Sequence, residues 1–252
     1  MLRMVSCLLA LMMLLGCVFP AAAETAAPLG DDVLFSYYDG AVFVGDSITR
    51  QLRIYLKEQS AKDVPLPTPT FLTAQSYLLY TASRKNLLAG HTNISYRGSE
   101  QPLCRIIGQM DPPPPQVYIL LGVNDYAGED IPKHIGYCQR LVMLLKEFSP
   151  ETKITFFSLT PVTKKFSGSK DRRALWDAYN LELEKLCAQE EVEYLDIATP
   201  LKDDDGYLKK EYCSDGQYHL SPEGLQVWLN TLKDHAQHQY ENGQWLPGEE
   251  HQ

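Results

Sequence analysis

Short apolar blocks recur along the chain, each closed by a polar or turn-forming residue. They are rich in β-branched and aromatic side chains, and the first block is followed at once by Gly45. A short continuous apolar run of this kind is typical of a strand that is buried on both faces of a parallel sheet. The predicted strands cover residues 41–44, 70–73, 117–121, 154–159 and 192–197.

Between these blocks, apolar residues recur every three or four positions, which is the period of one helix face. Residues 48–58 follow the first strand in this way. The last helix is predicted to begin at Ser221, an N-cap residue, with Pro222 in the first helical position. The other apolar faces are Ile135, Cys138, Val142 and Leu145; Leu175, Tyr179, Leu183 and Leu186; and Leu225, Trp228, Leu229 and Leu232.

The alternation of strands and helices predicts an α/β protein with an open, mostly parallel sheet of roughly five strands, covered by helices on both faces. Ligands of such sheets bind outside the carboxyl ends of the strands. The predicted domain spans residues 40–238. Residues 24–39, which lack periodicity, are predicted to be a lead-in segment, and residues 239–252 a C-terminal tail.

The amino terminus is typical of a secretory signal. Arg3 precedes an apolar run over residues 5–19, and three alanines at 21–23 offer a cleavage site. The run is shorter than the ~18 residues that a membrane-spanning helix needs. We expect residues 1–23 to be a signal peptide and the mature protein to be secreted or extracytoplasmic. In the alternative reading, Leu-Leu-Gly before Cys17 is a lipobox, and a lipid anchor on Cys17 holds a cell-surface lipoprotein.

Composition narrows the class of partner. The net charge is −9, and Lys and Arg form no basic stripe, which argues against a nucleic-acid partner. The remaining cysteines, Cys104, Cys138, Cys187 and Cys213, include no C-x-x-C pair, so we expect neither zinc nor another metal. Both disulfides and free thiols stay open for them. The sequence favours a small-molecule or glycan partner and leaves the oligomeric state open. We expect the protein to need no cofactor.

A candidate nucleophile follows the first predicted strand. In the run Gly45-Asp46-Ser47-Ile48-Thr49, the Ser47 hydroxyl and its own N–H emerge together at the positive end of a helix. The alternative is that Asp46 or Ser47 only caps that helix.

Two further blocks are predicted to meet Ser47. Gly122-Val123-Asn124-Asp125 follows the third strand, where the Asn124 amide could bind an oxyanion, unless it only makes a turn. Asp215 and His219 lie in a loop just before the last helix. The other histidines have no such context and are interpreted as surface or hydrogen-bonded structural residues: His91, His134, His235, His238 and His251.

Together these blocks resemble the SGNH, or GDSL-like, hydrolase superfamily of esterases and lipases. Its serine block matches residues 45–49, its G-x-N-D block residues 122–125, and its last block residues 215–219. The similarity extends over residues 40–235, toward a branch found in exported proteins of Firmicutes-type bacteria. It runs through Tyr96-Arg97-Gly98, residues 159–163, Tyr179-Asn180, residues 194–196 and the helix that holds Trp228.

The resemblance implies a flavodoxin-like three-layer α/β/α fold and hydrolysis of esters. By position, Ser47 would attack the carbonyl, His219 would take its proton, and Asp215 would orient His219. The Ser47 N–H, the Asn124 side chain and one further N–H would hold the oxyanion, with Gly45, Asp46 and Gly122 as supporting residues.

The sequence departs from the family pattern in two places. The acid usually precedes the histidine by three positions, but Asp215 precedes His219 by four and Gly216 occupies the usual site. If Asp215 does not reach the ring, a backbone carbonyl would orient it. The block that usually offers a glycine N–H corresponds to residues 73–76, which contain no glycine, so Ala74 or Gln75 is the candidate donor.

These observations predict an exported serine esterase that hydrolyses O-acetyl or short acyl esters on carbohydrate or cell-envelope substrates. One alternative is a lipase, lysophospholipase or acyltransferase that uses the same site. Another is a non-catalytic glycan-binding domain of the same fold.

Overall fold

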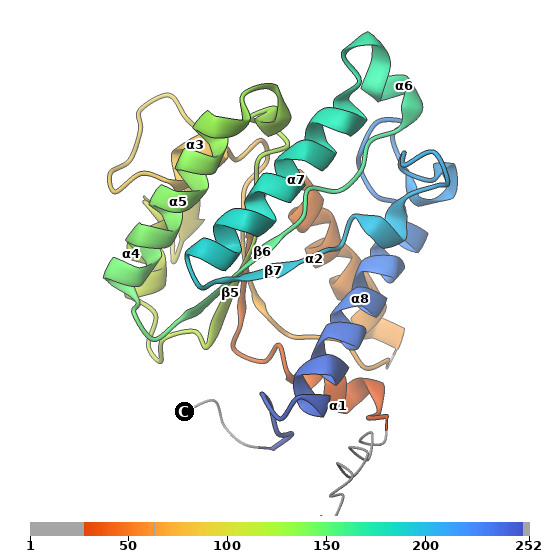
Figure 1. Cartoon of the computed structure of the whole chain (residues 1–252). Coiled ribbons are helices and arrows are strands. Elements are labelled where there is room, and N and C mark those ends of the chain that lie inside the picture. Colours follow the sequence, from red (N-terminus) through yellow and green to blue (C-terminus); the bar gives the residue numbers. More distant parts are fainter. Residues whose placement is uncertain (1–27, 63, 249–252) are drawn as a thin grey trace, which may run out of the picture.

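The computed structural model describes residues 28–62 and 64–248 and contains one central sheet (Figure 1). Five parallel strands lie in the order β2-β1-β5-β6-β7. All five predicted strands are present. Their bounds are β1 Val42–Gly45, β2 Thr70–Thr73, β5 Gln116–Leu120, β6 Lys153–Phe157 and β7 Glu193–Leu195. A separate antiparallel pair, β3 Ile94–Tyr96 and β4 Ser99–Gln101, lies between β2 and β5 in the chain.

Helices cover both faces of the sheet, so the predicted three-layer α/β/α architecture is confirmed (Figure 1). One layer consists of α1 Asp31–Ser36, α2 Ser47–Gln59 and α8 Pro222–Glu241. The other consists of α3 Leu79–Ala82, α4 Leu103–Gly108, α5 Ile131–Phe148 and α7 Arg172–Gln189. The short helix α6 Lys164–Ser167 leads into α7, and 3₁₀ turns cover Ser60–Lys62, Ala127–Glu129, Gly168–Lys170, Thr199–Leu201 and Lys210–Tyr212.

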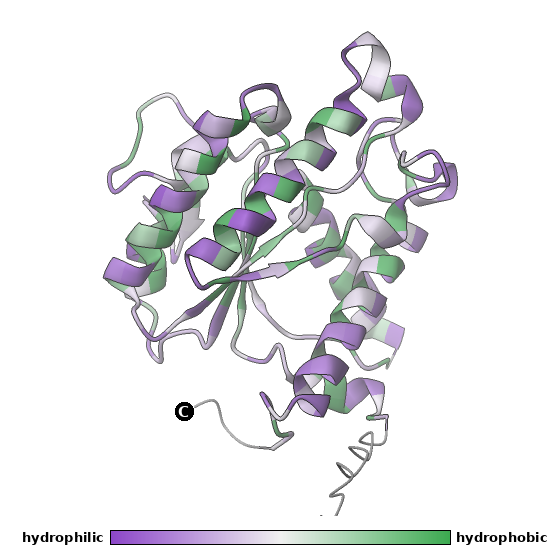
Figure 2. Cartoon of the chain, viewed as in Figure 1, coloured by the Kyte–Doolittle hydropathy of each residue, from purple (hydrophilic) through white to green (hydrophobic). Residues whose placement is uncertain are grey.

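The apolar patterns place the core as expected. Every residue of β1 and β5 is buried, because both faces of these inner strands are covered by helices. Hydrophobic and hydrophilic residues alternate along the helices, each of which has an apolar side and a polar side (Figure 2). Trp228 on α8 is fully buried and meets Phe157 of β6 edge to face. This contact holds the first half of α8 against the sheet, and the loop that carries His219 leads directly into this helix.

The structure corrects two predicted boundaries. Helix α1 lies inside the predicted lead-in, and Tyr38 is fully buried against Phe43 and Tyr118. At the other end, α8 continues to Glu241, and Trp245, 7% exposed, packs edge to face on Tyr37. Both segments are too short to show a periodic pattern in the sequence. They are ordered instead by contacts with residues that are distant in the chain. The packed domain therefore includes residues that we assigned to the lead-in and the tail.

Several predictions concern residues at or beyond the ends of the described part. The predicted signal peptide and Cys17 lie outside the described residues. Within residues 28–62 and 64–248, no helix is both long and apolar enough to cross a membrane.

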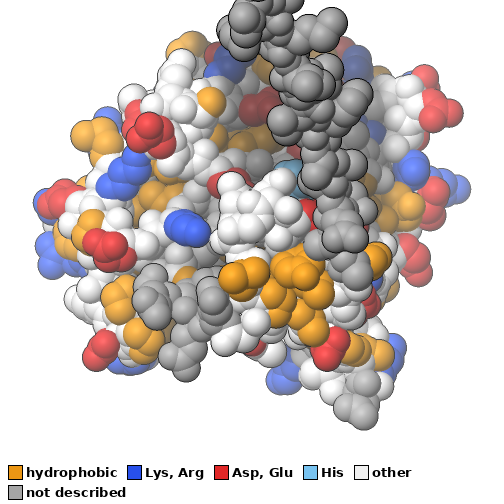
Figure 3. All heavy atoms as spheres, turned by 60° about the horizontal axis from the view of Figure 1, so that its bottom comes forward, with side chains coloured by type: hydrophobic (Ala, Val, Ile, Leu, Met, Phe, Trp, Pro, Cys, Tyr) orange, Lys and Arg blue, Asp and Glu red, His pale blue; other side chains and the backbone are white. Residues whose placement is uncertain are grey.

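The four cysteines of the domain are free thiols. On the face at the bottom of Figure 1, acidic and basic side chains are interspersed (Figure 3).

Candidate active site

Ser47 begins helix α2 directly after β1, as the sequence predicts. Asp46 is the N-cap residue, and its Oδ1 accepts a hydrogen bond from the Ile48 N–H at 2.9 Å. Gly45 is required for this turn, because a Cβ there would lie 1.9 Å from Thr49 Oγ1 and 2.9 Å from the Leu120 carbonyl oxygen. The Ser47 side chain is only partly buried, so a substrate can reach it.

His219 and Asp215 complete a row of three side chains with Ser47. Ser47 Oγ lies 2.9 Å from His219 Nε2, and His219 Nδ1 lies 2.6 Å from Asp215 Oδ2. Because the carboxylate can only accept, Nδ1 carries the proton and Nε2 is free to accept from the serine hydroxyl. The row brings together residues that are 172 positions apart in the chain.

The loop conformation explains how an acid four positions before the histidine reaches it. Asp215 Oδ1 accepts hydrogen bonds from the N–H groups of Gln217, Tyr218 and His219 at 2.7, 3.1 and 3.3 Å. The chain turns tightly around this carboxylate, with Gly216 at φ +73°. The extra residue is absorbed in the turn, and Oδ2 is left to bind the imidazole.

Two neighbouring segments hold this loop in place. The Thr163 N–H and hydroxyl both donate to the loop, to the carbonyls of Gln217 and Gly216, each at 2.8 Å. On the other side, the Gln51 amide of α2 bonds both backbone groups of Leu220 at 3.2 and 3.4 Å. The position of His219 relative to Ser47 is therefore fixed by hydrogen bonds from the N-cap residue of α6 on one side and from helix α2 on the other.

Asn124 reaches the same rim from the end of β5. Its side-chain amide donates to Asp46 Oδ2 at 2.7 Å. An amide has two N–H donors, so this bond leaves one N–H for a ligand and fixes the direction in which it points. Gly122, at φ +124°, makes the sharp turn before Asn124, and any Cβ there would meet Ala127 at 3.2 Å.

The structure separates the two candidates for the third oxyanion donor. The Ala74 N–H donates to the Gly45 carbonyl at 3.3 Å and continues the ladder between β1 and β2. Ala74 is thus a poor candidate. The register of β1 and β2 pairs Gly45 with Thr73, so Ser47 and Gln75 each lie two residues beyond this last pair. Within the described part of the chain, the Gln75 N–H has no hydrogen-bond acceptor.

Electrostatics differ between the two carboxylates of the site. Burial raises the pKa of Asp46 to about 6, although its hydrogen bonds to Ile48 and Asn124 oppose the rise. For Asp215, partial burial acts in the same direction, but the hydrogen bonds from His219 and the Gln217 N–H outweigh it and hold the pKa below its usual value. Asp215 therefore stays ionised beside the imidazole.

The family follows from a match over most of the chain. Residues 43–227 match the model of the GDSL-like lipase/acylhydrolase family. The chain belongs to the GDSL-like lipase/acylhydrolase family. It is an ester-hydrolysing enzyme of the serine hydrolase class. A search of curated protein sequences finds no match.

Solved structures share the fold of this GDSL-like hydrolase at low sequence identity. A GDSL-like lipase from Bacteroides thetaiotaomicron has a TM-score of 0.54 and 16% identity, over 82% of this chain and 98% of that one. A carbohydrate esterase family 3 protein from Talaromyces cellulolyticus has a TM-score of 0.54 and 15% identity, over 81% and 98%. An acetyl xylan esterase, AlAXEase, has a TM-score of 0.52 and 14% identity, over 77% and 98%.

Asp125 of the G-x-N-D block has no role that the sequence predicts, but the structure shows what it binds. Asp125 accepts hydrogen bonds from the N–H groups of Leu79 and Tyr80 at 2.7 and 3.0 Å, and so caps α3. Those residues follow the candidate donor Gln75, so Asp125 ties the segment after β2 to the end of β5. The partner is 46 positions away, and no local pattern signals it.

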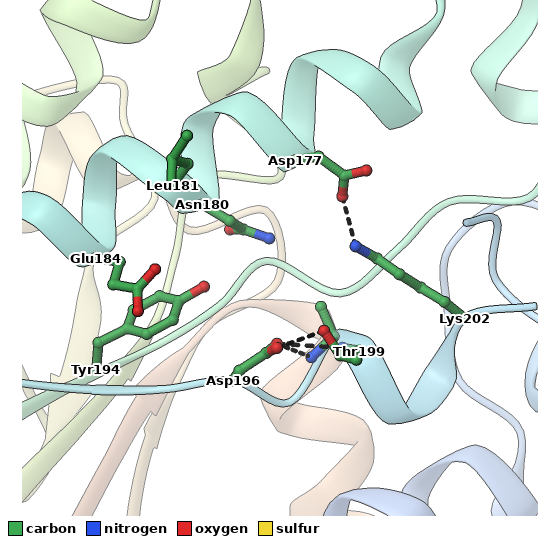
Figure 4. A pocket seen from close by; sticks show the side chains of 9 residues that line it. Asp177, Asn180, Leu181, Glu184, Tyr194, Asp196, Thr199 and Lys202 are labelled. Carbon is green, nitrogen blue, oxygen red and sulfur yellow. Dashed lines mark hydrogen bonds and ion pairs between the residues drawn. The ribbon is translucent and has the colours of Figure 1, made fainter. Parts of the chain in front are cut away.

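Two cavities of the hydrolase lie away from this row. One of 180 Å³ lies between α7 and the segment after β7, where Lys202 pairs with Asp177 at 2.7 Å and Asp196 binds Thr199 (Figure 4). A larger one of 700 Å³ lies at the amino ends of β5, β6 and β7. Neither is lined by Ser47, Asn124 or His219.

Among the described residues, no group of three or more His, Cys, Asp or Glu side chains is arranged to hold a metal ion.

Proposed function

We propose that this chain is an exported serine esterase that hydrolyses O-acetyl or other short acyl esters, with Ser47 as nucleophile, His219 as general base and Asp215 as the acid that orients it. The observation that carries the proposal is the continuous row from Ser47 Oγ through the imidazole to Asp215 Oδ2, with contacts of 2.9 and 2.6 Å. Distances of this size are those that a nucleophile and its base need.

In the first half of the reaction, His219 Nε2 takes the hydroxyl proton as Ser47 Oγ attacks the ester carbonyl carbon. The carbonyl oxygen becomes an oxyanion, and the imidazole becomes a cation that Asp215 stabilises without accepting its proton. His219 then returns the proton to the alcohol oxygen as the bond to that oxygen breaks, which leaves an acyl group on Ser47. In the second half, water replaces the alcohol and the same transfers release the acid.

The oxyanion needs donors that point at it before it forms. We assign this role to the Ser47 N–H, to the Asn124 amide N–H that Asp46 does not use, and to the Gln75 N–H. Gln75 replaces the earlier pair of candidates because the Ala74 N–H is already bonded to Gly45. The absence of glycine in this segment is no obstacle, since only a backbone N–H is required.

Two features support a short acyl group on a carbohydrate alcohol. Solved structures with the same fold include a carbohydrate esterase and an acetyl xylan esterase. The amino-terminal sequence is typical of export, which would bring the enzyme to cell-envelope or extracellular glycans. An extracytoplasmic location, by secretion or by an anchor at Cys17, is part of this proposal.

The test is hydrolysis of 4-nitrophenyl acetate by residues 24–252, compared with the Ser47→Ala variant. We expect turnover by the wild type and a rate at the uncatalysed background for the variant. A matched control is Ser36→Ala, which alters a partly buried serine in α1, away from the row. Equal rates for wild type and Ser47→Ala would contradict the proposal and favour a non-catalytic glycan-binding domain.

A further inference from the structure

A row of planar side chains extends from the imidazole of His219 across the surface. The Tyr218 ring lies 4.7 Å from the His219 ring, and the Phe166 ring lies 5.1 Å from Tyr218. The Arg172 guanidinium then lies 4.9 Å from the Phe166 ring and 5.7 Å from the Tyr126 ring. We call Tyr218, Phe166, Arg172 and Tyr126 the aromatic row.

The two ends of the aromatic row are close in sequence to two of the proposed site residues. One end is Tyr218, the residue before the general base. The other is Tyr126, two residues after the oxyanion donor Asn124. We infer that the row runs along one flank of an ester bound between His219 and Asn124, because Tyr218 also contacts the His219 ring.

The exposed end of the row is held in an uncommon backbone conformation. Tyr126 has φ +51° and ψ +49°, in the left-handed region that a bulky residue rarely adopts. Its N–H donates to the Val123 carbonyl at 3.2 Å, and its carbonyl accepts from Glu129 at 2.8 Å. The side chain is nonetheless 45% exposed. The turn thus holds Tyr126 in a strained backbone conformation in which its aromatic side chain is exposed to solvent.

The middle of the row is fixed rather than mobile. Arg172 donates from Nη1 to the Phe166 carbonyl at 2.9 Å and lies 3.9 Å from Glu129. Phe166 is partly buried and packs near Trp176, 6.4 Å between ring centroids. The guanidinium lies between two aromatic rings, and the Arg172 side chain keeps 21% of its surface exposed.

The position of the row decides which half of the ester it contacts. His219 must return its proton to the departing alcohol, so the surface continuous with His219 faces the alcohol rather than the acyl group. This surface offers aromatic faces for C–H groups and a guanidinium and phenol for hydroxyl groups. A saturated ring that carries several hydroxyl groups matches both features, whereas an alkyl chain would leave the polar groups unpaired.

We propose that the aromatic row is the binding platform for the alcohol part of the substrate and that this alcohol is a sugar ring, with Tyr126 as a specificity-determining residue. The inference rests on the esterase activity proposed above. Tyr126 contacts the sugar beyond the reacting ester, and contributes to recognition of alcohols that are large enough to reach it.

The test compares two acetate esters on the same enzyme preparation, with acetate release measured for both. One is a partially O-acetylated xylo-oligosaccharide, and the other is ethyl acetate, whose alcohol is too short to reach Tyr126. The variants are Tyr126→Leu, which removes the ring, and Tyr126→Phe, which keeps it. The ratio of the two kcat/KM values is independent of the fraction of folded enzyme. Met143→Ala on α5, 63% exposed, is the remote control.

We expect Tyr126→Leu to lower the ratio of glycan to ethyl acetate kcat/KM by about five- to tenfold, the effect of losing one aromatic contact. Tyr126→Phe should retain most of the ratio, and Met143→Ala should not change it. A ratio that is equal in wild type and Tyr126→Leu would overturn the platform and leave the esterase intact. Hexyl acetate, measured as a third substrate, tests an alkyl alcohol: a larger loss in Tyr126→Leu on hexyl acetate than on the glycan would also overturn the platform. Absence of turnover with every ester would instead refute the esterase proposal itself.

Discussion

The molecule contains two rows of hydroxyl, imidazole and carboxylate, at opposite ends of its sheet. At the carboxyl ends of the strands, Ser47 and Asp215 flank His219 at 2.9 and 2.6 Å. At the amino ends, the Tyr38 hydroxyl and Glu193 flank His235 at 2.9 and 2.7 Å. In distances alone the two rows are almost the same. We call Ser47, His219 and Asp215 the upper row, and Tyr38, His235 and Glu193 the lower row.

Their surroundings differ. The side chains of His219 and Asp215 are 26% and 29% exposed, and an amide donor lies beside the serine. The side chain of His235 is 6% exposed, and Tyr38 is fully buried and donates to the Leu232 carbonyl at 2.8 Å. Burial raises the pKa of Tyr38 well above its usual value, so its hydroxyl stays protonated.

The comparison shows that three side chains in line do not make a reactive site. The upper row has a hydroxyl that solvent can reach and donors for a developing oxyanion. The lower row has neither, and each of its members is bonded to a neighbour in the core, Glu193 also to Gln116 at 3.0 Å and Thr155 at 2.7 Å. The first arrangement suits catalysis, and the second joins the segment after α1, helix α8 and the edge strand β7.

Replacement of the two imidazoles should separate these roles most strongly. His219→Ala removes the base, and we expect kcat on 4-nitrophenyl acetate to fall by roughly 10⁵-fold or more. His235→Ala should leave turnover per folded molecule near that of the wild type, but lower the free energy of unfolding by about 1–3 kcal/mol, because buried partners lose a hydrogen bond. Turnover and urea denaturation measure the two effects. A greater loss of turnover in His235→Ala than in His219→Ala would reverse the assignment.

Replacement of the two acids should give the next largest difference. Asp215→Asn keeps the size of the side chain but no longer holds the proton on Nδ1 of His219, and the expected loss in kcat is up to about 10⁴-fold. The matched change at the other end, Glu193→Gln, should not reduce kcat in this way. A loss below about tenfold for Asp215→Asn would mean that another group orients the ring.

Asn124→Ala tests the proposed oxyanion donor, which has no counterpart in the lower row. We expect kcat to fall by about 10²- to 10³-fold with a smaller change in KM, since the bond strengthens only in the transition state. Asn242→Ala, an exposed asparagine at the end of α8, is the control. An unchanged kcat in Asn124→Ala would place the oxyanion elsewhere.

The two ends should also respond to pH with opposite sign. The pKa of Asp46 is raised from 3.8 to about 6, chiefly by burial, so the folded protein takes up a proton between these values and its stability falls as pH rises through them. This rise in pKa corresponds to a change of at most ~3 kcal/mol in the free energy of unfolding between low and neutral pH. Asp46→Asn, which does not titrate, should remove this pH dependence. For Glu193, burial raises the pKa, but the hydrogen bond and charge of His235 outweigh it and lower the pKa below 4.5. Its contribution to stability is therefore present above pH 4.5 and lost as pH falls through the lowered value.

Denaturation of wild type, Asp46→Asn and Glu193→Gln across pH 3 to 7, a range that covers both titrations, measures this difference. The wild type should lose stability relative to Asp46→Asn as pH rises, and gain stability relative to Glu193→Gln. Slopes of the same sign for the two pairs would contradict the opposite pKa directions.

The sequence predicted the upper row better than the lower one for a physical reason. Ser47, Asn124 and His219 each follow or precede a recognisable element, and parallel strands bring their carboxyl ends to one rim. The contact of Asp215 with His219 was left open, because it depends on a turn around Gly216 that residue spacing does not determine. His235 is interpreted from the sequence as a surface or hydrogen-bonded structural residue, and the structure shows both of its ring nitrogens hydrogen-bonded. Its partners Tyr38 and Glu193 were not found, since they meet only through packing over 197 and 42 positions.

The most direct test of which hydroxyl reacts is labelling with a fluorophosphonate, which phosphonylates an activated serine by displacement of fluoride. Intact mass should show one adduct per molecule, and peptide mapping should place it on Ser47, with no adduct in Ser47→Ala or His219→Ala and a normal adduct in His235→Ala. An adduct on Tyr38, or esterase turnover without any adduct on Ser47, would contradict the assignment of Ser47 as the nucleophile.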